Sequence, residues 1–137
     1  MNIQIKHKGS PARPICASRC IYHRHTLLAS EANHHIIVST IGRMIDIHAE
    51  GWPNKISYDT VGSNNRMYET MVFCGTPCND CKPSCGMILI DPSRTISLPL
   101  PWQINHIDNT TDAAADNMHD AAVDYVHQNF YSLYIHE

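Results

Sequence analysis

The stretch ETMVFCGTPCNDC, residues 69–81, decides the expected fold. Its first six residues include β-branched and aromatic side chains and predict a strand. Gly75 and Pro77 end that strand, because both residue types favour turns. A helix is expected over residues 78–90, with Pro83 near its first turn. The stretch therefore predicts a strand that leads directly into a helix.

The segments on either side predict further strands and helices. The expected strands cover residues 26–30, 35–41 and 94–98. A turn at residues 31–33 separates the first two, and a short helix is expected to begin near Glu50. A long helix is expected from Thr111 to about Phe130, where apolar residues recur at helical spacing. Strands alternating with helices favour an α/β fold of three layers around a mixed sheet.

Length and composition indicate one domain. The chain has 137 residues, 43% of them apolar, and no apolar run approaches the roughly 18 residues of a membrane span. We expect a single domain over residues 1–137, with residues 1–22 as an irregular N-terminal segment. No apolar stretch follows the early basic residues, so we expect no signal peptide and a cytoplasmic protein. The net charge of −3 argues against a long nucleic-acid footprint.

Two short motifs together point to a metal-dependent enzyme. The first is His48-Ala49-Glu50, an H-x-E, and the second is PCNDC at residues 77–81, a P-C-x-x-C. Each motif is weak by itself in a chain with ten histidines and six cysteines. Their conjunction in this order, with residues 51–76 between them, is far less expected by chance.

The residue types in these motifs suit a catalytic zinc ion. Cys78 and Cys81, three positions apart at the expected start of a helix, can chelate one ion as thiolates. His48 completes three protein ligands and leaves the fourth tetrahedral position to water. Zinc lowers the pKa of that water, so that a hydroxide can attack the amino-bearing carbon of a base. Glu50 would be the catalytic general acid and base beside it.

The sequence from Arg24 to Val126 resembles the cytidine and deoxycytidylate deaminase superfamily. The resemblance lies in the H-x-E, in residues 23–28, in residues 70–81 and in the late segment 115–123. It implies a three-layer α/β/α fold with a mixed sheet of about five strands. It also implies Zn²⁺ on His48, Cys78 and Cys81, and hydrolytic deamination of a cytosine-type nucleoside or nucleotide with release of ammonia. Deoxycytidylate is the leading candidate for the substrate.

Substrate contacts are expected from four residues: Ala49, Trp52, Pro77 and Arg24. The resemblance implies that the backbone amide of Ala49 faces the base, and Trp52 can stack on it. Arg24 belongs to a local group of basic residues that suits one phosphate. The expected partners are a small nucleoside or nucleotide and further copies of the chain, because members of the family are commonly oligomeric.

Other interpretations stay open. Editing of a base within RNA or DNA is a second enzymatic one, although the low basic content argues against it. A third is a non-catalytic zinc module that uses Cys74, Cys78, Cys81 and Cys85, or a degenerate deaminase fold that only binds nucleotides.

Two further groups of residues have simpler interpretations. A second, structural zinc ion on Cys16, Cys20, His23 and His25 is an alternative to four unmetallated side chains. Late aspartates at positions 112, 116, 120 and 124 are interpreted as a solvated helix face.

Overall fold

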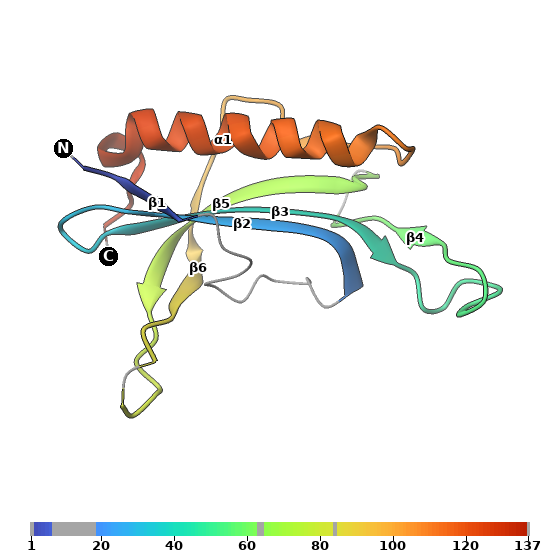
Figure 1. The fold of residues 1–137 in the computed structure, drawn as a ribbon, viewed down its shortest axis with the longest axis horizontal. Helices are drawn as coiled ribbons and strands as arrows, with labels where there is room; N and C mark the ends of the chain where they lie inside the picture. The colour runs from blue at the N-terminus through green and yellow to red at the C-terminus, as the bar shows by residue number, and fades with distance from the viewer. Residues whose placement is uncertain (1, 7–18, 63–64, 84, 137) are drawn as a thin grey trace.

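The computed structural model describes residues 2–6, 19–62, 65–83 and 85–136, in which seven strands form one sheet and one long helix follows them (Figure 1). The strands are β1 (Gln4–Lys6), β2 (Cys20–Ala29), β3 (His35–Ile45), β4 (Tyr58–Asp59), β5 (Tyr68–Pro77), β6 (Ile88–Ile96) and β7 (Gln103–Ile104), and the helix is α1 (Thr111–Leu133). The main strands lie in the order β1-β2-β3-β5-β6, with β4 on β3 and β7 on β5. Every described pair of strands is antiparallel.

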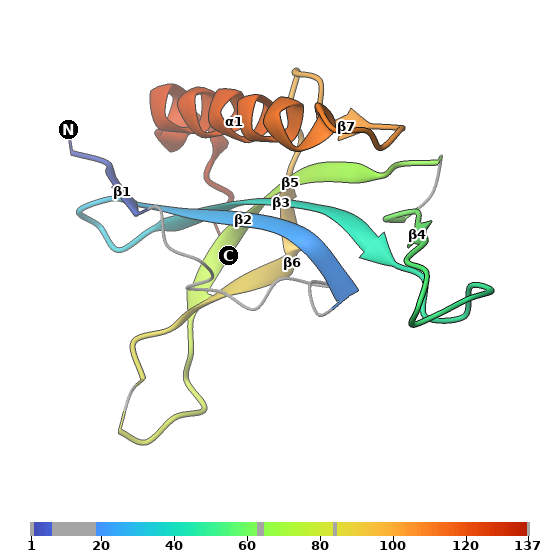
Figure 2. The same ribbon diagram turned by 45° about the vertical axis from the view of Figure 1, so that its right-hand side comes forward.

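Helix α1 lies along one face of this sheet, as the two views of Figures 1 and 2 show. The largest core cluster contains Leu28, Ile36, Val38 and Val72 of the sheet together with Ala122, Val126 and Phe130 of α1. The described elements form two layers, so the α/β class is confirmed and the three-layer arrangement is not. The expectation of a mixed sheet is wrong for the described strands, because each pair of neighbours in the sheet is antiparallel.

Several elements form where the sequence predicts them. The expected strands at 26–30, 35–41 and 69–74 fall on β2, β3 and β5, and the expected helix at 111–130 falls on α1. The turn between β2 and β3 is tight, because the Asn33 N–H donates to the Ser30 carbonyl and Asn33 takes a φ of 59°. The expected strand at 94–98 overlaps only the end of β6.

The helix expected over residues 78–90 is wrong. From Ile88 onward the chain forms β6, which pairs with β5, and the residues before it form the connecting loop. Pro83 lacks the N–H that a helix interior needs, and Gly86 takes a φ of 71°, a left-handed conformation that glycine adopts without strain. These two residues turn the chain back on itself, and a hairpin results.

The short helix expected near Glu50 is wrong as well. The chain forms turns there, in which the Trp52 N–H donates to the Ala49 carbonyl and Gly51 takes a φ of 90°. It then returns as β4 beside β3. Gly51 and Pro53 favour turns over a helix at these positions. No helix in the described part of the chain has both the length and the apolar character to cross a membrane.

Candidate metal centre at the tip of the β5–β6 hairpin

Three cysteines meet at the tip of the hairpin that β5 and β6 form. The Cys78 N–H donates to the Met87 carbonyl at 2.8 Å and closes the base of the loop. The sulfur atoms of Cys78, Cys81 and Cys85 all lie within 4.8 Å of one another. Figures 1 and 2 show the hairpin projecting from the sheet, away from α1. Three sulfur ligands this close could hold a metal ion.

The spacing of two of these sulfurs matches the geometry of a zinc site. The Sγ atoms of Cys78 and Cys81 are 3.8 Å apart. A tetrahedral zinc ion with Zn–S bonds of about 2.3 Å separates its sulfur ligands by about 3.8 Å. Donor sets made only of thiolates select Zn²⁺, Cu⁺ or iron rather than Mg²⁺ or Ca²⁺. Three thiolates leave the fourth tetrahedral position to another ligand.

The thiols influence one another's protonation. Hydrogen bonds to Cys85 and Cys78 raise the pKa of Cys81 to about 11. The pKa of Cys85 is lowered, chiefly by a hydrogen bond from the Met87 backbone and then by Cys81. Cys81 and Cys85 are exposed and Cys78 is half-buried, so an ion can reach the group from solvent. A cation among the sulfurs would favour three thiolates, because it offsets their mutual repulsion.

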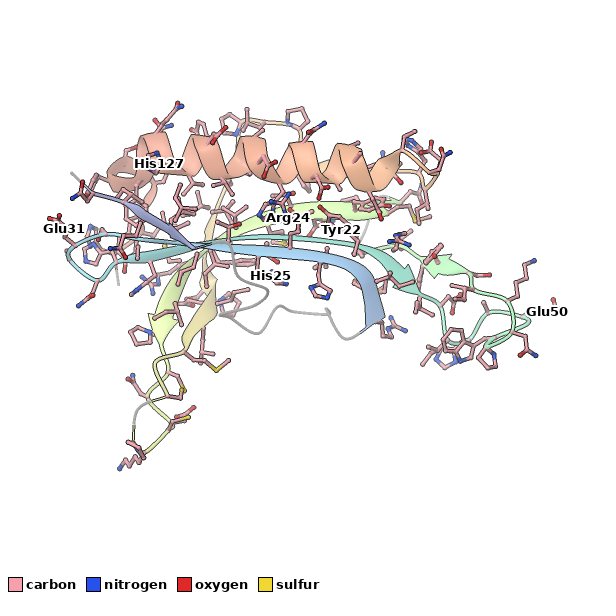
Figure 3. The ribbon with its side chains drawn as sticks, in the orientation of Figure 1. Tyr22, Arg24, His25, Glu31, Glu50 and His127 are labelled. Atoms are coloured by element: carbon pink, nitrogen blue, oxygen red, sulfur yellow. The ribbon has the colours of Figure 1, made fainter. Side chains whose placement is uncertain are left out.

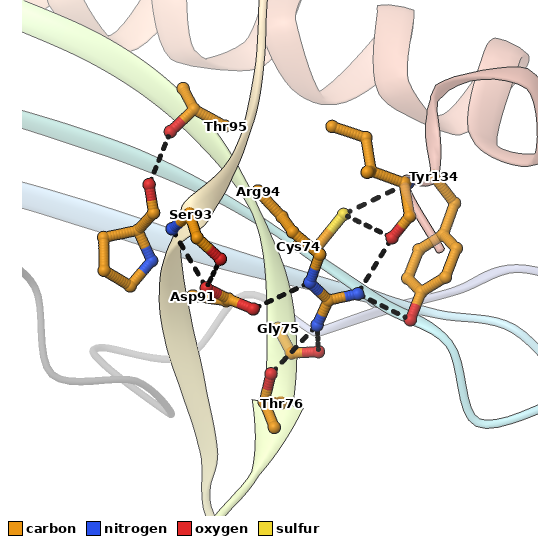
Figure 4. Close-up of polar contacts among 10 residues, drawn as sticks. Cys74, Gly75, Thr76, Asp91, Ser93, Arg94, Thr95 and Tyr134 are labelled. Carbon is orange, nitrogen blue, oxygen red and sulfur yellow. Dashed lines mark hydrogen bonds and ion pairs between the residues drawn. The ribbon is translucent and has the colours of Figure 1, made fainter. Parts of the chain in front are cut away.

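Arg94 connects the base of this hairpin to the C-terminal segment (Figure 4). Its buried guanidinium pairs with Asp91 at 2.7 Å and donates to Thr76 Oγ1 at 2.9 Å and to the Ile135 carbonyl at 2.9 Å. Thr76 lies two residues before Cys78, so these contacts hold the strand that leads into the cluster. A restrained hairpin base lowers the conformational entropy lost when the three thiolates converge on one ion.

Cys74 lies apart from the other three cysteines. It is fully buried in the core between the sheet and α1, and the Ile135 N–H donates to its sulfur at 3.3 Å. The sequence allowed a zinc site of four cysteines. In the structure three of them converge, and the fourth, Cys74, is a core residue. Alternation along β5 explains this, because Cys74 points to the helix face while the loop begins only after Pro77.

His48 and Glu50 lie at the opposite end of the sheet from the cysteines. Strands β3 and β5 are antiparallel, with His35 beside Gly75 at one end and Gly42 beside Tyr68 at the other. These ends are about 24 Å apart, because seven residues of a strand each advance about 3.4 Å.

The chain continues from the first end into the cysteine loop and from the second end into the loop with His48. Figure 3 shows Glu50 in that second loop, far from the hairpin tip. The metal-ligand cluster found among the described residues contains Cys78, Cys81 and Cys85, without His48. The structure brings Cys78 and Cys81 together as expected, but not His48 or Glu50. Deamination stays a prediction that this geometry does not support.

The other expected site residues are also dispersed. Ala49 and Trp52 lie in the loop of His48, and Pro77 ends β5 beside the cysteine loop. Arg24 lies on β2, facing α1, with ion pairs of 3.3 Å to Asp116 and 3.0 Å to Asp120. Its guanidinium is therefore engaged by the helix, and the aspartates interpreted as a solvated face are partly ion-paired.

The second group of possible zinc ligands is not assembled in the described residues. Cys16 lies outside them. Cys20 is buried at the start of β2, and the rings of His23 and His25 stack with their centroids 5.8 Å apart. Among the described side chains these residues form no metal-ligand cluster.

No protein-family model matches this sequence, and comparisons with curated proteins and with solved structures found no match.

The deaminase prediction omitted Cys85 as a ligand. The sequence signal that could have identified Cys85 is the full spacing C-x-x-C-x-x-x-C, which is followed by Gly86. A glycine directly after a cysteine lets the chain turn and direct the sulfur back toward the first two.

Proposed function

We propose that this protein is a zinc-binding module whose β5–β6 hairpin holds one Zn²⁺ through Cys78, Cys81 and Cys85. The observation that supports it is the convergence of three sulfurs with a separation of 3.8 Å between two of them. Zinc is the favoured ion because it accepts tetrahedral thiolate coordination and needs no redox partner.

The role of this ion is to order the hairpin rather than to activate a water molecule. Hydrolytic zinc chemistry needs a general base beside the open coordination position. Glu50, the predicted base, belongs to a loop at the other end of the sheet. Within the described residues, neither a histidine nor a carboxylate joins the three sulfurs. The fourth position is therefore assigned to water or to an external donor atom.

Titration of the reduced protein with Co²⁺ tests the proposal. Cobalt in a tetrahedral thiolate site produces intense absorption from sulfur-to-metal charge transfer, and we expect it to saturate at one equivalent. Zinc should then displace the cobalt and bleach the spectrum. A chain with Cys78, Cys81 and Cys85 all changed to serine should give no such absorption. Absorption of equal intensity from that variant, or none from the unmodified chain, would refute the proposal.

A further inference from the structure

A cavity lies on the face of the sheet opposite α1, and its lining contains none of the three clustered cysteines. Its volume is about 370 Å³, and it opens against β3, β5 and β6. The apolar residues of its lining include Ile41, Met71, Phe73, Met44 and Val61. The volume falls within the range of about 300–1,000 Å³ that is usual for small-molecule sites.

Among the described residues, two charged side chains line this cavity, and they differ in their partners. Glu69 is buried, and its carboxylate lies 2.6 Å from Arg66 Nη1 in an ion pair. Burial raises the pKa of Glu69 and Arg66 opposes that shift, so each partner offsets the cost of burying the other. The Glu69–Arg66 pair carries no net charge toward the cavity.

Arg19 is the second charged side chain of the cavity wall. Its one polar contact with a described residue is to the Met44 sulfur, at 3.5 Å. A thioether sulfur is a weak acceptor that carries no charge. Arg19 is half-buried, and the remaining donors of its guanidinium have no acceptor within the described part of the chain. A guanidinium fork of this kind matches the two oxygens of a carboxylate.

We propose that this cavity binds a medium-chain fatty acid, with its carboxylate on Arg19 and its aliphatic chain along Ile41, Met71 and Phe73. Charge complementarity selects the head group, because Arg19 supplies the net charge of the described lining. Ile41, Met71 and Phe73 are apolar, so they bury a hydrocarbon chain favourably, and the Glu69 carboxylate on the same lining is paired with Arg66. Ser39 also lines the cavity, and its small side chain leaves volume for the hydrocarbon chain.

Isothermal titration calorimetry with decanoate tests this site directly. Decanoate should bind at one equivalent, and decanol, which has the same chain without the charge, should bind about tenfold more weakly or less. Arg19→Gln should reduce decanoate affinity about tenfold or more and leave decanol binding unchanged. Lys55→Gln removes the same charge from an exposed loop and should change neither affinity.

Ser39→Leu fills the cavity and should abolish binding of both compounds. If that variant fails to fold by circular dichroism, Met71→Gln replaces it, since Met71 is 36% exposed and its change alters only the apolar wall. Cys85→Ser should bind decanoate normally, which separates this site from the metal centre. Absence of decanoate binding, equal affinities of Arg19→Gln and the unmodified chain, or decanoate binding by the filled cavity would each overturn the proposal.

Discussion

The imidazole of His119 lies 2.7 Å from the hydroxyl of Thr40, in the fully buried layer between α1 and the sheet. Its other ring nitrogen lies 2.7 Å from the Thr26 hydroxyl. The Thr40 hydroxyl also bonds to Thr70 at 2.7 Å, so the network extends across three neighbouring strands. One helix side chain thus sets the position of α1 over β2, β3 and β5.

Changing His119 to leucine should destabilise the fold by about 2–4 kcal/mol, because two buried hydrogen bonds are lost and polar hydroxyls face an apolar group. Urea denaturation should show a lower midpoint with an unchanged slope. His127→Leu makes the same substitution on the exposed side of α1 and should shift stability by no more than about 0.5 kcal/mol. Equal effects of the two substitutions would show that the buried network contributes nothing.

Single serine substitutions should identify the metal ligands. Replacing Cys78, Cys81 or Cys85 should weaken zinc binding by more than about 100-fold, because loss of even an outer-shell partner costs 10–100-fold. Cys74→Ser and His48→Ala should retain zinc, since one residue is in the core and the other is at the far end of the sheet. Competition with a chromogenic chelator measures these affinities. Loss of zinc in His48→Ala, together with ammonia release from deoxycytidylate by the unmodified chain, would instead support the deaminase prediction.

Arg94→Met should lower stability by about 2–4 kcal/mol. The methionine retains the aliphatic packing but leaves Asp91 and the Ile135 carbonyl without the guanidinium. Breaking one partner of a largely buried ion pair is costly, and here the 23% exposure of Asp91 moderates that cost. Thermal denaturation measures the change, and Lys55→Met is the exposed control.

A double variant, Arg94→Met with Asp91→Asn, should lose less stability than the sum of its single variants, because the two side chains interact. Strict additivity would show that the Arg94–Asp91 ion pair drawn in Figure 4 does not couple the two side chains energetically.

Stability should fall as the pH drops from about 6.5 to about 4, through His25. Burial, and secondarily the neighbouring His23, lower the pKa of His25 from 6.5 to about 4. In this pH range the unfolded chain binds a proton that the folded chain does not, so acid favours unfolding. The full stabilisation is present above pH 6.5, and a shift of this size corresponds to about 3 kcal/mol.

Chemical denaturation at a series of pH values measures this dependence. His25→Leu should flatten the curve between pH 6.5 and 4 relative to the unmodified chain, because the titrating group is gone. The same slope in both proteins would assign the dependence to other groups.

The elements of this protein follow local sequence signals to an unequal degree. The apolar stripe of α1 and the β-branched residues of β2, β3 and β5 predict these elements, because periodic burial leaves its pattern in neighbouring residues. The loop at residues 78–87 has apolar, polar and turn-forming residues mixed together, so helix and hairpin were both compatible with it. Pro83 and Gly86 favoured the hairpin, and the pairing of β6 with β5 decided it.

Local sequence also predicts the candidate site only in part. The spacing of Cys78, Cys81 and Cys85 already places three thiols within one short loop. Because they are close in sequence, little chain entropy is lost when they converge. The partnership of this loop with His48 depends on how β3 and β5 are paired. An antiparallel register places the ends that carry the two motifs at opposite edges of the sheet.

By itself, the sequence determined where the longest helix and the central strands form and that Cys78 and Cys81 lie close together, because these depend on side-chain periodicity and short chain separations. Only the tertiary structure decided the antiparallel strand order, the burial of Cys74, the ion pairing of Arg24 with α1 and the separation of Glu50 from the sulfurs. Each of these depends on contacts between residues far apart in the chain, whose energies no local pattern records.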